Sequence, residues 1–455
     1  MTTRTSPGTA RLGRSRSGAA RPGTARPGTM RPDTAPPGTG TGRIDATRWP
    51  DVAVAAGSPV RAVVARAVFT NAVTRLPLRV RFPDGHAIGG GGADSPVMVL
   101  RRPREFYRRF GASGLIGFGE AYMAGDWDSE DLTALLVVLA EHAAELVPPW
   151  LQRLRRLAVR RHPGEDLQTV AGARRNIGRH YDLSNDLFAL FLDETMTYSS
   201  AVFTDPDAIG AMDPLAEARF LAEAQHRKID RLLDRAGVGR GSRVLEIGTG
   251  WGELAIRAAR RGATVHTVTI SREQAELATR RIAEAGLAAQ VRVDLCDYRD
   301  VEGQFDAICS VEMIEAVGDR YWDTFFTALD QHLAPGGRIG LQTITMAHDR
   351  MLATRHTYTW IQKYIFPGGL LPSVTAIGDS LSRTRLRMVA REDFGVHYAE
   401  TLRLWRERFG AHGGEVARLG FDEVFSRMWT FYLSYTEAGF RAGYIDVSQL
   451  TLARI

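Results

Sequence analysis

Cysteine and long apolar runs are scarce in this sequence of 455 residues. Cys296 and Cys309 are its two cysteines, and both stand in apolar contexts typical of strands, which excludes a disulfide framework and a thiolate metal site. The longest apolar runs, such as residues 132–140, fall short of the about 20 residues that span a bilayer. We therefore expect a cytoplasmic protein that meets a membrane only peripherally, at its inner face.

Basic charge is also missing from most of the chain. The formal net charge is +6, but the first fifty residues hold nine Arg and two Asp, a local balance of +7, so the remainder stands at about −1. A nucleic-acid-binding body is expected to carry its own basic face. The charge distribution therefore argues against a nucleic-acid partner.

Residues 1–48 consist mainly of Arg, Pro, Gly, Thr, Ala and Ser, with an imperfect repeat in which Arg21, Arg26 and Arg31 each precede a Pro. This composition cannot bury a core and predicts a disordered tail. It has no apolar segment of the kind that a secretory signal needs. Either the tail holds the protein near anionic lipid, at about 1 kcal/mol per Arg close to the surface, or it is a solvated extension without function.

The length and a hydrophobic content of 44% predict two globular units after the tail. The first, residues 49–165, is expected to hold an amphipathic helix at 60–73, strands at 76–82 and 97–100 and an apolar helix at 132–146. It ends in the charged segment 153–161, which Pro163 and Gly164 follow.

From residue 166 to residue 455 strands alternate with helices, which predicts an α/β doubly wound sheet. Segment 346–373 interrupts the alternation, is rich in Tyr, Trp and Phe, and is predicted to be an inserted lid. The predicted strands are residues 244–247, 264–270, 291–295, 305–311, 338–345, 386–390 and 448–453. The predicted helices are residues 221–236, 254–261, 272–285, 321–333 and 396–409.

The most informative stretch runs from Val244 to Glu253, where an apolar strand leads into a turn with Gly248, Gly250 and Gly252 and then into a helix. Glycine lets the backbone approach a ligand, and the helix N-terminus supplies free N–H groups. A dinucleotide site needs G-x-G-x-x-G and a carboxylate after the next strand, and the sequence has neither. Glu246 followed by G-x-G-x-G resembles instead the turn with which class I methyltransferases bind S-adenosylmethionine (SAM). The alternative is a tight turn without a ligand.

Two carboxylates follow the predicted strand 305–311, at the sheet edge where ligands of α/β folds bind. For Glu312 a place in the first turn of a helix, favoured by the helix dipole, is a sufficient explanation. Glu315 lies among apolar residues, and a buried carboxylate indicates a functional role.

Aromatic and polar clusters outside the predicted strands occur at residues 180–186 with 197–200, 312–318, 358–369 and 431–433. In this order around the turn they resemble the cyclopropane fatty-acyl-phospholipid synthase and mycolic acid methyltransferase family. The resemblance covers about residues 100–453. Segments 310–318 and 397–408 look most similar to the actinobacterial branch that makes tuberculostearic acid by methylating oleoyl chains of phospholipids.

The resemblance implies a class I SAM-dependent methyltransferase with a Rossmann-like sheet, with SAM as cofactor and phospholipid acyl chains at the membrane surface as partners. It also implies that the first unit, residues 49–165, is associated with the lipid substrate. The SAM-binding residues that the turn and the resemblance indicate are Tyr198, Ser199, Glu246, Gly248, Gly250, Gly252, Thr269, Ile270, Gln274, Asp297 and Tyr298. The family also holds a bicarbonate ion beside the methyl group. The residues at its ligand positions here are Glu315, Ile344 and Tyr432, with Ser200 in place of the usual Cys and Gln342 in place of the usual His.

In this chemistry the alkene attacks the SAM methyl group and leaves a carbocation, which aromatic faces stabilise and water would quench. A base, either bicarbonate or Glu315, then removes a proton. The sequence favours a methylene-branched product, which a separate reductase would saturate, over a cyclopropane. The rival classes are an NAD(P) oxidoreductase, a lipid-binding module without catalysis, and a methyltransferase for small molecules or RNA. The oligomeric state stays open, a homo-oligomer included.

Overall fold

A computed structural model describes residues 44–143, 184–206 and 214–455. Residues 44–455 belong to one compact unit. Most of the predicted tail and the predicted domain boundary near residue 161 lie outside the described residues, so the division at residue 165 stays a prediction. The described fold begins before residue 49, because the Arg48 guanidinium pairs with Asp422 at 3.6 Å and the Trp49 indole donates to the same carboxylate at 2.8 Å.

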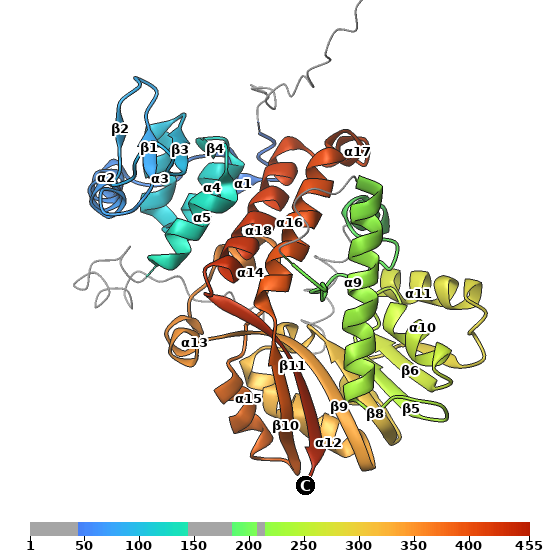
Figure 1. Ribbon diagram of the computed structural model, residues 1–455. Helices are drawn as coiled ribbons and strands as arrows, with labels where there is room; N and C mark the ends of the chain where they lie inside the picture. Colours follow the sequence, from blue (N-terminus) through green and yellow to red (C-terminus); the bar gives the residue numbers. More distant parts are fainter. Residues whose placement is uncertain (1–43, 144–183, 207–213) are drawn as a thin grey trace, which may run out of the picture. The chain divides into compact units, whose positions relative to one another are not determined.

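A seven-stranded sheet lies at the centre of the C-terminal part of the chain (Figure 1). Its order is β10-β11-β9-β8-β5-β6-β7, in which β5 to β9 are parallel and β11 runs antiparallel to both of its neighbours. The strands are β5 (Arg243–Ile247), β6 (Thr264–Thr269), β7 (Val291–Leu295), β8 (Phe305–Val311), β9 (Leu333–Met346), β10 (Leu386–Asp393) and β11 (Ile445–Arg454). Because β6 pairs on one side of β5 and β8 on the other, the strand order reverses at β5, which opens a crevice at the carboxyl ends of these strands.

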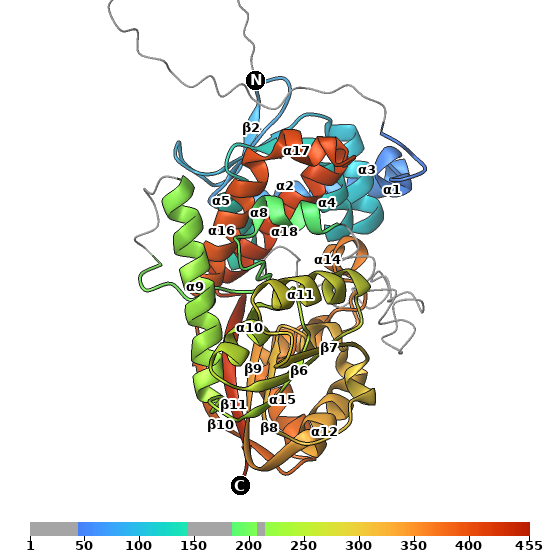
Figure 2. The same cartoon turned by 90° about the vertical axis from the view of Figure 1, so that its right-hand side faces the viewer.

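Helices cover both faces of this sheet, as the alternation predicted (Figure 2). On one face are α9 (Pro214–Arg235), α10 (Glu253–Arg260) and α11 (Arg272–Glu284); on the other are α12 (Trp322–His332) and α15 (Val374–Leu381). The predicted inner face of α9 is confirmed, since Ile229, Leu232 and Leu233 are buried against β5 and its neighbours. The fold is the predicted α/β doubly wound sheet.

A second, four-stranded sheet of order β2-β1-β3-β4 lies in the N-terminal part. Its strands are β1 (Arg79–Arg81), β2 (Ala87–Ile88), β3 (Val97–Leu100) and β4 (Trp127–Ser129). The helices of this part are α1 (Pro50–Ala53), α2 (Pro59–Val73), α3 (Pro103–Ser113), α4 (Leu115–Met123) and α5 (Leu132–Glu141). The prediction that α2 is amphipathic was wrong: Phe69 and Val73 are buried, but Val60, Val63 and Val64 on the opposite face are exposed.

Three helices near the C-terminus pack against one another, and the last of them also packs against α4 and α5 of the N-terminal part. The three helices are α16 (Gly395–Ala411), α17 (Gly413–Arg418) and α18 (Glu423–Arg441), and the short α8 (Asn185–Phe191) packs beside α16. Phe431 of α18 contacts Trp127 of β4 and Trp360 at ring-centroid distances of 6.3 and 4.8 Å. The sequence had not predicted α18, which carries the cluster at residues 431–433.

Segment 346–373, the predicted lid, contains α13 (His348–Thr354) and α14 (Trp360–Tyr364). The buried Glu120 of α4 accepts hydrogen bonds from the Lys363 ammonium and, at 2.9 Å, from the Tyr364 hydroxyl. Lys363 also pairs with Asp51 at 2.6 Å. The segment is therefore attached to the N-terminal part through two carboxylates, Glu120 and Asp51.

Replacing Glu120 by Gln is expected to lower the free energy of unfolding by about 1.5–3 kcal/mol, because a hydrogen-bonded ion pair in a buried place is lost. Thermal unfolding followed by circular dichroism measures this. Glu130→Gln is the control, since Glu130 is exposed on the surface of the same part of the chain. Equal midpoints for Glu120→Gln and wild type would show that the hydrogen-bonded ion pair of Glu120 contributes nothing to stability.

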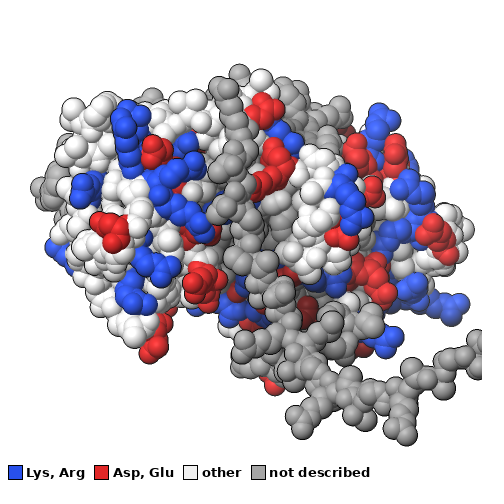
Figure 3. All heavy atoms as spheres, turned by 90° about the horizontal axis from the view of Figure 1, so that it is seen from above, with Lys and Arg blue, Asp and Glu red and all other residues white. Residues whose placement is uncertain are grey.

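Acidic and basic side chains share the face drawn in Figure 3, where neither sign forms a continuous field over the described residues. Within the described residues, no helix combines the length and the apolarity that crossing a bilayer requires.

Candidate active site

The glycine-rich turn after β5 has a backbone that glycine accepts most readily. Gly248 has a φ of 97° and Gly250 a φ of 50°. A Cβ atom on Gly248 would lie 2.5 Å from Cγ of Met313, so a side chain there would require Met313 to move. The N–H groups of Gly248 and Thr249 both donate to the Val268 carbonyl, at 3.0 and 3.2 Å, which fixes the turn against β6.

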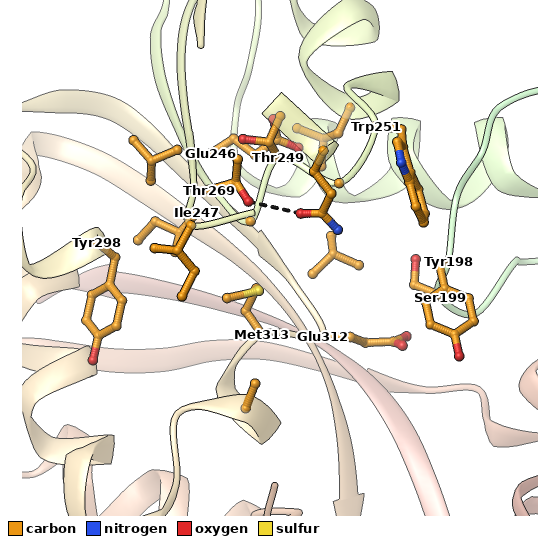
Figure 4. Close-up of a pocket in the computed structure, with 18 of the residues that line it drawn as sticks. Tyr198, Ser199, Glu246, Ile247, Thr249, Trp251, Thr269, Tyr298, Glu312 and Met313 are labelled. Atoms are coloured by element: carbon orange, nitrogen blue, oxygen red, sulfur yellow. Dashed lines mark hydrogen bonds between the residues drawn. The ribbon is translucent and has the colours of Figure 1, made fainter. Parts of the chain in front are cut away.

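A pocket with about 1200 Å³ of non-atom space, part of it open to solvent, lies at the carboxyl ends of β5, β6 and β8. Figure 4 shows Tyr298 at one end, Tyr198 and Ser199 at the other, and Ile247 between them. Ten of the eleven predicted SAM-binding residues line it: Tyr198, Ser199, Glu246, Gly248, Gly250, Thr269, Ile270, Gln274, Asp297 and Tyr298. Gly252 does not; it caps α10, and a Cβ there would meet Ala278 at 3.2 Å.

At the end of β6 the Thr269 hydroxyl donates to Oε1 of Gln274 at 2.9 Å (Figure 4). The amide oxygen of Gln274 is thereby used within the protein. Its NH₂ group makes no hydrogen bond within the described residues and can donate to a ligand. This pair occupies the position where a dinucleotide site would have a carboxylate.

Tyr298 forms the wall of one end, packed edge-on against Phe325 at 5.4 Å, and burial raises the pKa of its hydroxyl to about 12. The neighbouring Asp297 is buried and forms a two-pronged ion pair with Arg299, at 2.8 and 2.7 Å. The Arg299 guanidinium also lies 5.4 Å from the centre of the Tyr298 ring. This end thus offers a flat aromatic wall next to polar groups.

Two buried charged groups line the middle of the pocket. Burial raises the pKa of Glu246 to about 8, and its Oε2 atom has no hydrogen-bond partner among the described residues. Burial lowers the pKa of Lys228 on α9 to about 8, against the opposing attraction of Glu312. The Lys228 ammonium donates to the Ser199 hydroxyl at 2.7 Å.

At the other end of the pocket the hydroxyl groups of Tyr198 and Tyr432 lie 2.7 Å apart. Phe366, from the predicted lid, packs edge-on against Tyr432 at 5.8 Å. Trp360 and Tyr364 of the same segment face α4 and α18 instead. Of these three lid aromatics, Phe366 therefore reaches the predicted catalytic residues.

Glu312 lies at the same end and does not belong to a helix, because the next helical turn begins at Ile314. Its φ is 51°, a backbone conformation that costs a non-glycine residue about 1–2 kcal/mol. Oε1 accepts hydrogen bonds from the Ser200 N–H at 3.0 Å and the Gln342 amide at 2.8 Å, and Oε2 accepts one from the Tyr398 hydroxyl at 2.6 Å. The explanation of Glu312 as a first-turn carboxylate was wrong.

Glu315 lies close to Glu312 but binds a different set of groups. Its Oε1 accepts hydrogen bonds from the Ile344 N–H at 2.5 Å and the Thr343 hydroxyl at 2.9 Å. Its Oε2 is buried without a partner among the described residues. Burial, and then repulsion from Glu312, raises the pKa of Glu315 to about 8. A carboxylate with a raised pKa and an unoccupied oxygen has the properties of a general base.

Residues 168–450 match the protein family described as mycolic acid cyclopropane synthetase. The chain belongs to this family. It is 56% identical over 420 residues to tuberculostearic acid methyltransferase UfaA1 from Mycobacterium tuberculosis, covering 91% of this chain and 97% of the relative. It is 36% identical over 382 residues to cyclopropane-fatty-acyl-phospholipid synthase from Escherichia coli, covering 81% of this chain and 90% of the relative.

Solved structures of the mycolic acid cyclopropane synthetase family have the same fold. Mycolic acid cyclopropane synthase CmaA1, complexed with SAH and CTAB, superposes with a TM-score of 0.55 at 33% identity, covering 61% of this chain and 97% of that chain. The present chain is a SAM-dependent methyltransferase of this family, and SAM is its cofactor.

The five predicted catalytic residues are divided among three sets of hydrogen bonds. Ser200 and Gln342 bind Glu312, while Ile344 binds Glu315. Tyr432 binds Tyr198.

Sequence reasoning missed Glu312, Lys228 and Tyr398 as members of the site. A charged residue on the mainly apolar inner face of α9 was the available signal for Lys228. Tyr398 gave no local signal, since it contacts Glu312 from 86 residues away.

Proposed function

We propose that this enzyme transfers the SAM methyl group to the cis double bond of oleoyl chains in phospholipids and yields a 10-methylene-stearoyl chain. The observation that carries the proposal is the place of the two buried carboxylates. Glu312 lies at the Tyr198 end of the cofactor pocket and Glu315 beside it, at the end away from the aromatic wall of Tyr298. The 56% identity to a tuberculostearic acid methyltransferase supports the same substrate.

SAM bound in this pocket would place its adenine against Tyr298 and its ribose near Thr269 and Gln274. Its methionyl part would then extend past the glycine turn to Ser199. The sulfonium methyl group would lie at the end where Tyr198, Tyr432 and Glu312 gather. This orientation brings the positive sulfonium next to a negative side chain, which favours binding of the cofactor.

The same groups suit the reaction. The π electrons of the alkene form the new C–C bond as the C–S bond breaks, and the positive charge moves to the acyl chain. The aromatic faces of Tyr198, Tyr432 and Phe366 stabilise that charge and exclude water. Glu315 then takes the proton on its unoccupied Oε2.

A cyclopropane is the second candidate product, favoured by the 36% identity to a cyclopropane-fatty-acyl-phospholipid synthase. It forms when the proton leaves the new methyl group before a hydride shift. The two fatty acids are isomers, so mass alone does not distinguish them. Proton NMR spectra of lipids from a host that expresses the chain and is supplied with oleate distinguish the two products. A methylene group gives alkene signals, and a cyclopropane gives strongly upfield signals. Cyclopropane signals alone would overturn the product assignment.

Peripheral attachment to the membrane would follow from a substrate that lies in a bilayer. The predicted contribution of the basic tail lies outside the described residues. Helix α2 offers a second means: Val60, Val63 and Val64 are 74%, 69% and 55% exposed on one face, with Arg61 and Arg66 exposed nearby. Apolar side chains flanked by basic ones suit a bilayer of anionic phospholipids.

Replacing Val63 by Asp is expected to weaken binding to vesicles of oleoyl phosphatidylglycerol roughly tenfold, because full burial of a Val side chain contributes about 1.5 kcal/mol. Co-sedimentation measures the binding, and turnover on detergent-dispersed lipid should stay unchanged. Val389→Asp on β10, where the side chain is 49% exposed, is the matched control. If both variants bind vesicles as wild type does, α2 is not the attachment surface.

A further inference from the structure

Two of the five residues predicted to hold bicarbonate, Ser200 and Gln342, donate hydrogen bonds to a carboxylate of the chain itself. The Ser200 N–H and the Gln342 amide both donate to Oε1 of Glu312, at 3.0 and 2.8 Å. The Ser200 hydroxyl donates to the Ala201 carbonyl at 3.0 Å. The second N–H of the Gln342 amide is directed at the Ser200 carbonyl, at 3.5 Å, so neither residue at the two substituted ligand positions has a donor left for another anion.

The orientation of the Gln342 amide is fixed by its neighbours. Arg231, which can only donate, binds Oε1 of Gln449 at 2.8 Å. The Gln449 amide must then present its NH₂ group to Oε1 of Gln342, at 3.1 Å. Gln342 in turn must present its own NH₂ group to Glu312. Neither amide in this series of hydrogen bonds can exchange its oxygen and its NH₂ group without breaking a bond to its neighbour. Gln342 is therefore fixed as a donor to a negative group at the Glu312 position.

A separate bicarbonate would also lie between two carboxylates, because Glu312 and Glu315 are close enough for their repulsion to raise the pKa of Glu315. Like charges in a buried place disfavour each other strongly. This arrangement argues against bicarbonate, the predicted second cofactor, as a ligand of these residues.

We propose that the carboxylate of Glu312 takes the place of bicarbonate in this enzyme, so that methyl transfer needs no added anion and Glu315 acts as the base. The inference rests on the proposed function and deepens it. The alkene π pair bonds to the SAM methyl carbon, and the C–S electron pair stays on the sulfur of the departing S-adenosylhomocysteine. A hydride moves to the cationic carbon from the carbon bearing the new methyl group. Oε2 of Glu315 takes a methyl proton, and that C–H pair becomes the C=C bond. Burial raises the pKa of Glu312, against the opposing effect of the hydrogen bonds from Tyr398, Gln342 and the Ser200 N–H and of the charge on Lys228. Glu312 acts in its ionised form, as a fixed negative charge beside the cation.

The backbone conformation of Glu312 indicates that its side chain has a function, and it suggests a variant that tests the proposal. A residue other than glycine at φ 51° is kept at a cost, which points to a function of its side chain. Glycine accepts the same φ without strain. Glu312→Gly therefore removes the carboxylate, keeps the backbone and frees the donors of Ser200 and Gln342. Glu312→Gln removes the charge but keeps the space filled.

The experiment compares wild type, Glu312→Gly and Glu312→Gln in buffer stripped of carbon dioxide, with and without added bicarbonate. Wild-type turnover should not change on removing bicarbonate. Both variants should lose roughly 10²-fold, as expected for loss of a preorganised charge. Bicarbonate should restore Glu312→Gly at least tenfold, by occupying the freed donors, and should not restore Glu312→Gln. The limb of the pH profile that Glu315 governs should move to lower pH in Glu312→Gln, because the repelling charge is gone.

Binding of ¹³C-labelled bicarbonate, followed by NMR without any lipid, separates this inference from the proposed function. Wild type should show no saturable binding and Glu312→Gly should show it. Saturable binding to wild type, or loss of wild-type turnover without bicarbonate, would overturn the inference. Absence of lipid methylation under every condition would overturn the proposed function alone, and the binding comparison would still decide between Glu312 and bicarbonate.

Discussion

Glu315→Gln is expected to lower the turnover number by 10²-fold or more while leaving the affinity for SAM intact. A Gln amide keeps the hydrogen bond from the Ile344 N–H but cannot take a proton, and general acid–base groups typically contribute 10²–10⁴-fold. Glu315 does not line the cofactor pocket, so calorimetric titration with SAM should give the wild-type affinity. Glu302→Gln, an exposed site on the loop before β8, is the control. Full turnover of Glu315→Gln would remove Glu315 from the mechanism.

The same carboxylate gives the pH dependence of the wild-type enzyme. Burial and the neighbouring Glu312 raise the pKa of Glu315 to about 8, and a base must be ionised to act. The ratio kcat/KM should therefore rise with pH through about 8. The stability of the fold changes with pH in the opposite direction. A carboxyl with a raised pKa binds its proton more tightly in the folded state than in the unfolded state. The contribution of Glu315 to the free energy of unfolding is therefore fully present below about pH 4.5 and is lost as the pH rises through about 8. Chemical unfolding at pH 6 and pH 9 should show that the free energy of unfolding falls less between these two pH values in Glu315→Gln than in wild type.

Much of the fold was predictable, because its strands are continuous apolar runs between turn residues. Strands β7 and β8 begin and end at the predicted residues, and the inner face of α9 was predicted correctly. Strands β2 and β4, of two and three residues, were missed because so short a run has no period. Helix α18 was missed because its aromatic residues were interpreted as a ligand cluster rather than as the face that packs on Trp127 and Trp360.

The site divides in the same way. Residues of the turn and of the strand ends could be placed on the pocket from local pattern alone, since the carboxyl ends of parallel strands meet at one edge. The hydrogen bonds around Glu312 could not be predicted from local pattern. Glu312 meets Ser200 across 112 residues and Gln342 across 30, and the orientation of Gln342 depends on Gln449 at the far end of the chain. The effect of Ser200 or Gln342 at its ligand position can therefore be understood only together with Glu312, which both residues bind.

Gly250→Val is expected to abolish SAM binding, with a loss of affinity of at least roughly 10²-fold. The residue has a φ of 50° and lines the pocket, and no atom lies within 4 Å of the position of a Cβ, so the added side chain would stand in space that the cofactor needs. Gly286→Val is a matched control, since Gly286 has a φ of 72° and equally open space but lies after α11, away from the pocket. Both variants should lose about 1–2 kcal/mol of stability from backbone strain, and calorimetry should show wild-type affinity for SAM only in Gly286→Val. Wild-type affinity in Gly250→Val would exclude the glycine turn as the SAM site, whereas equal losses in both variants would assign the effect to strain rather than to contact with the cofactor.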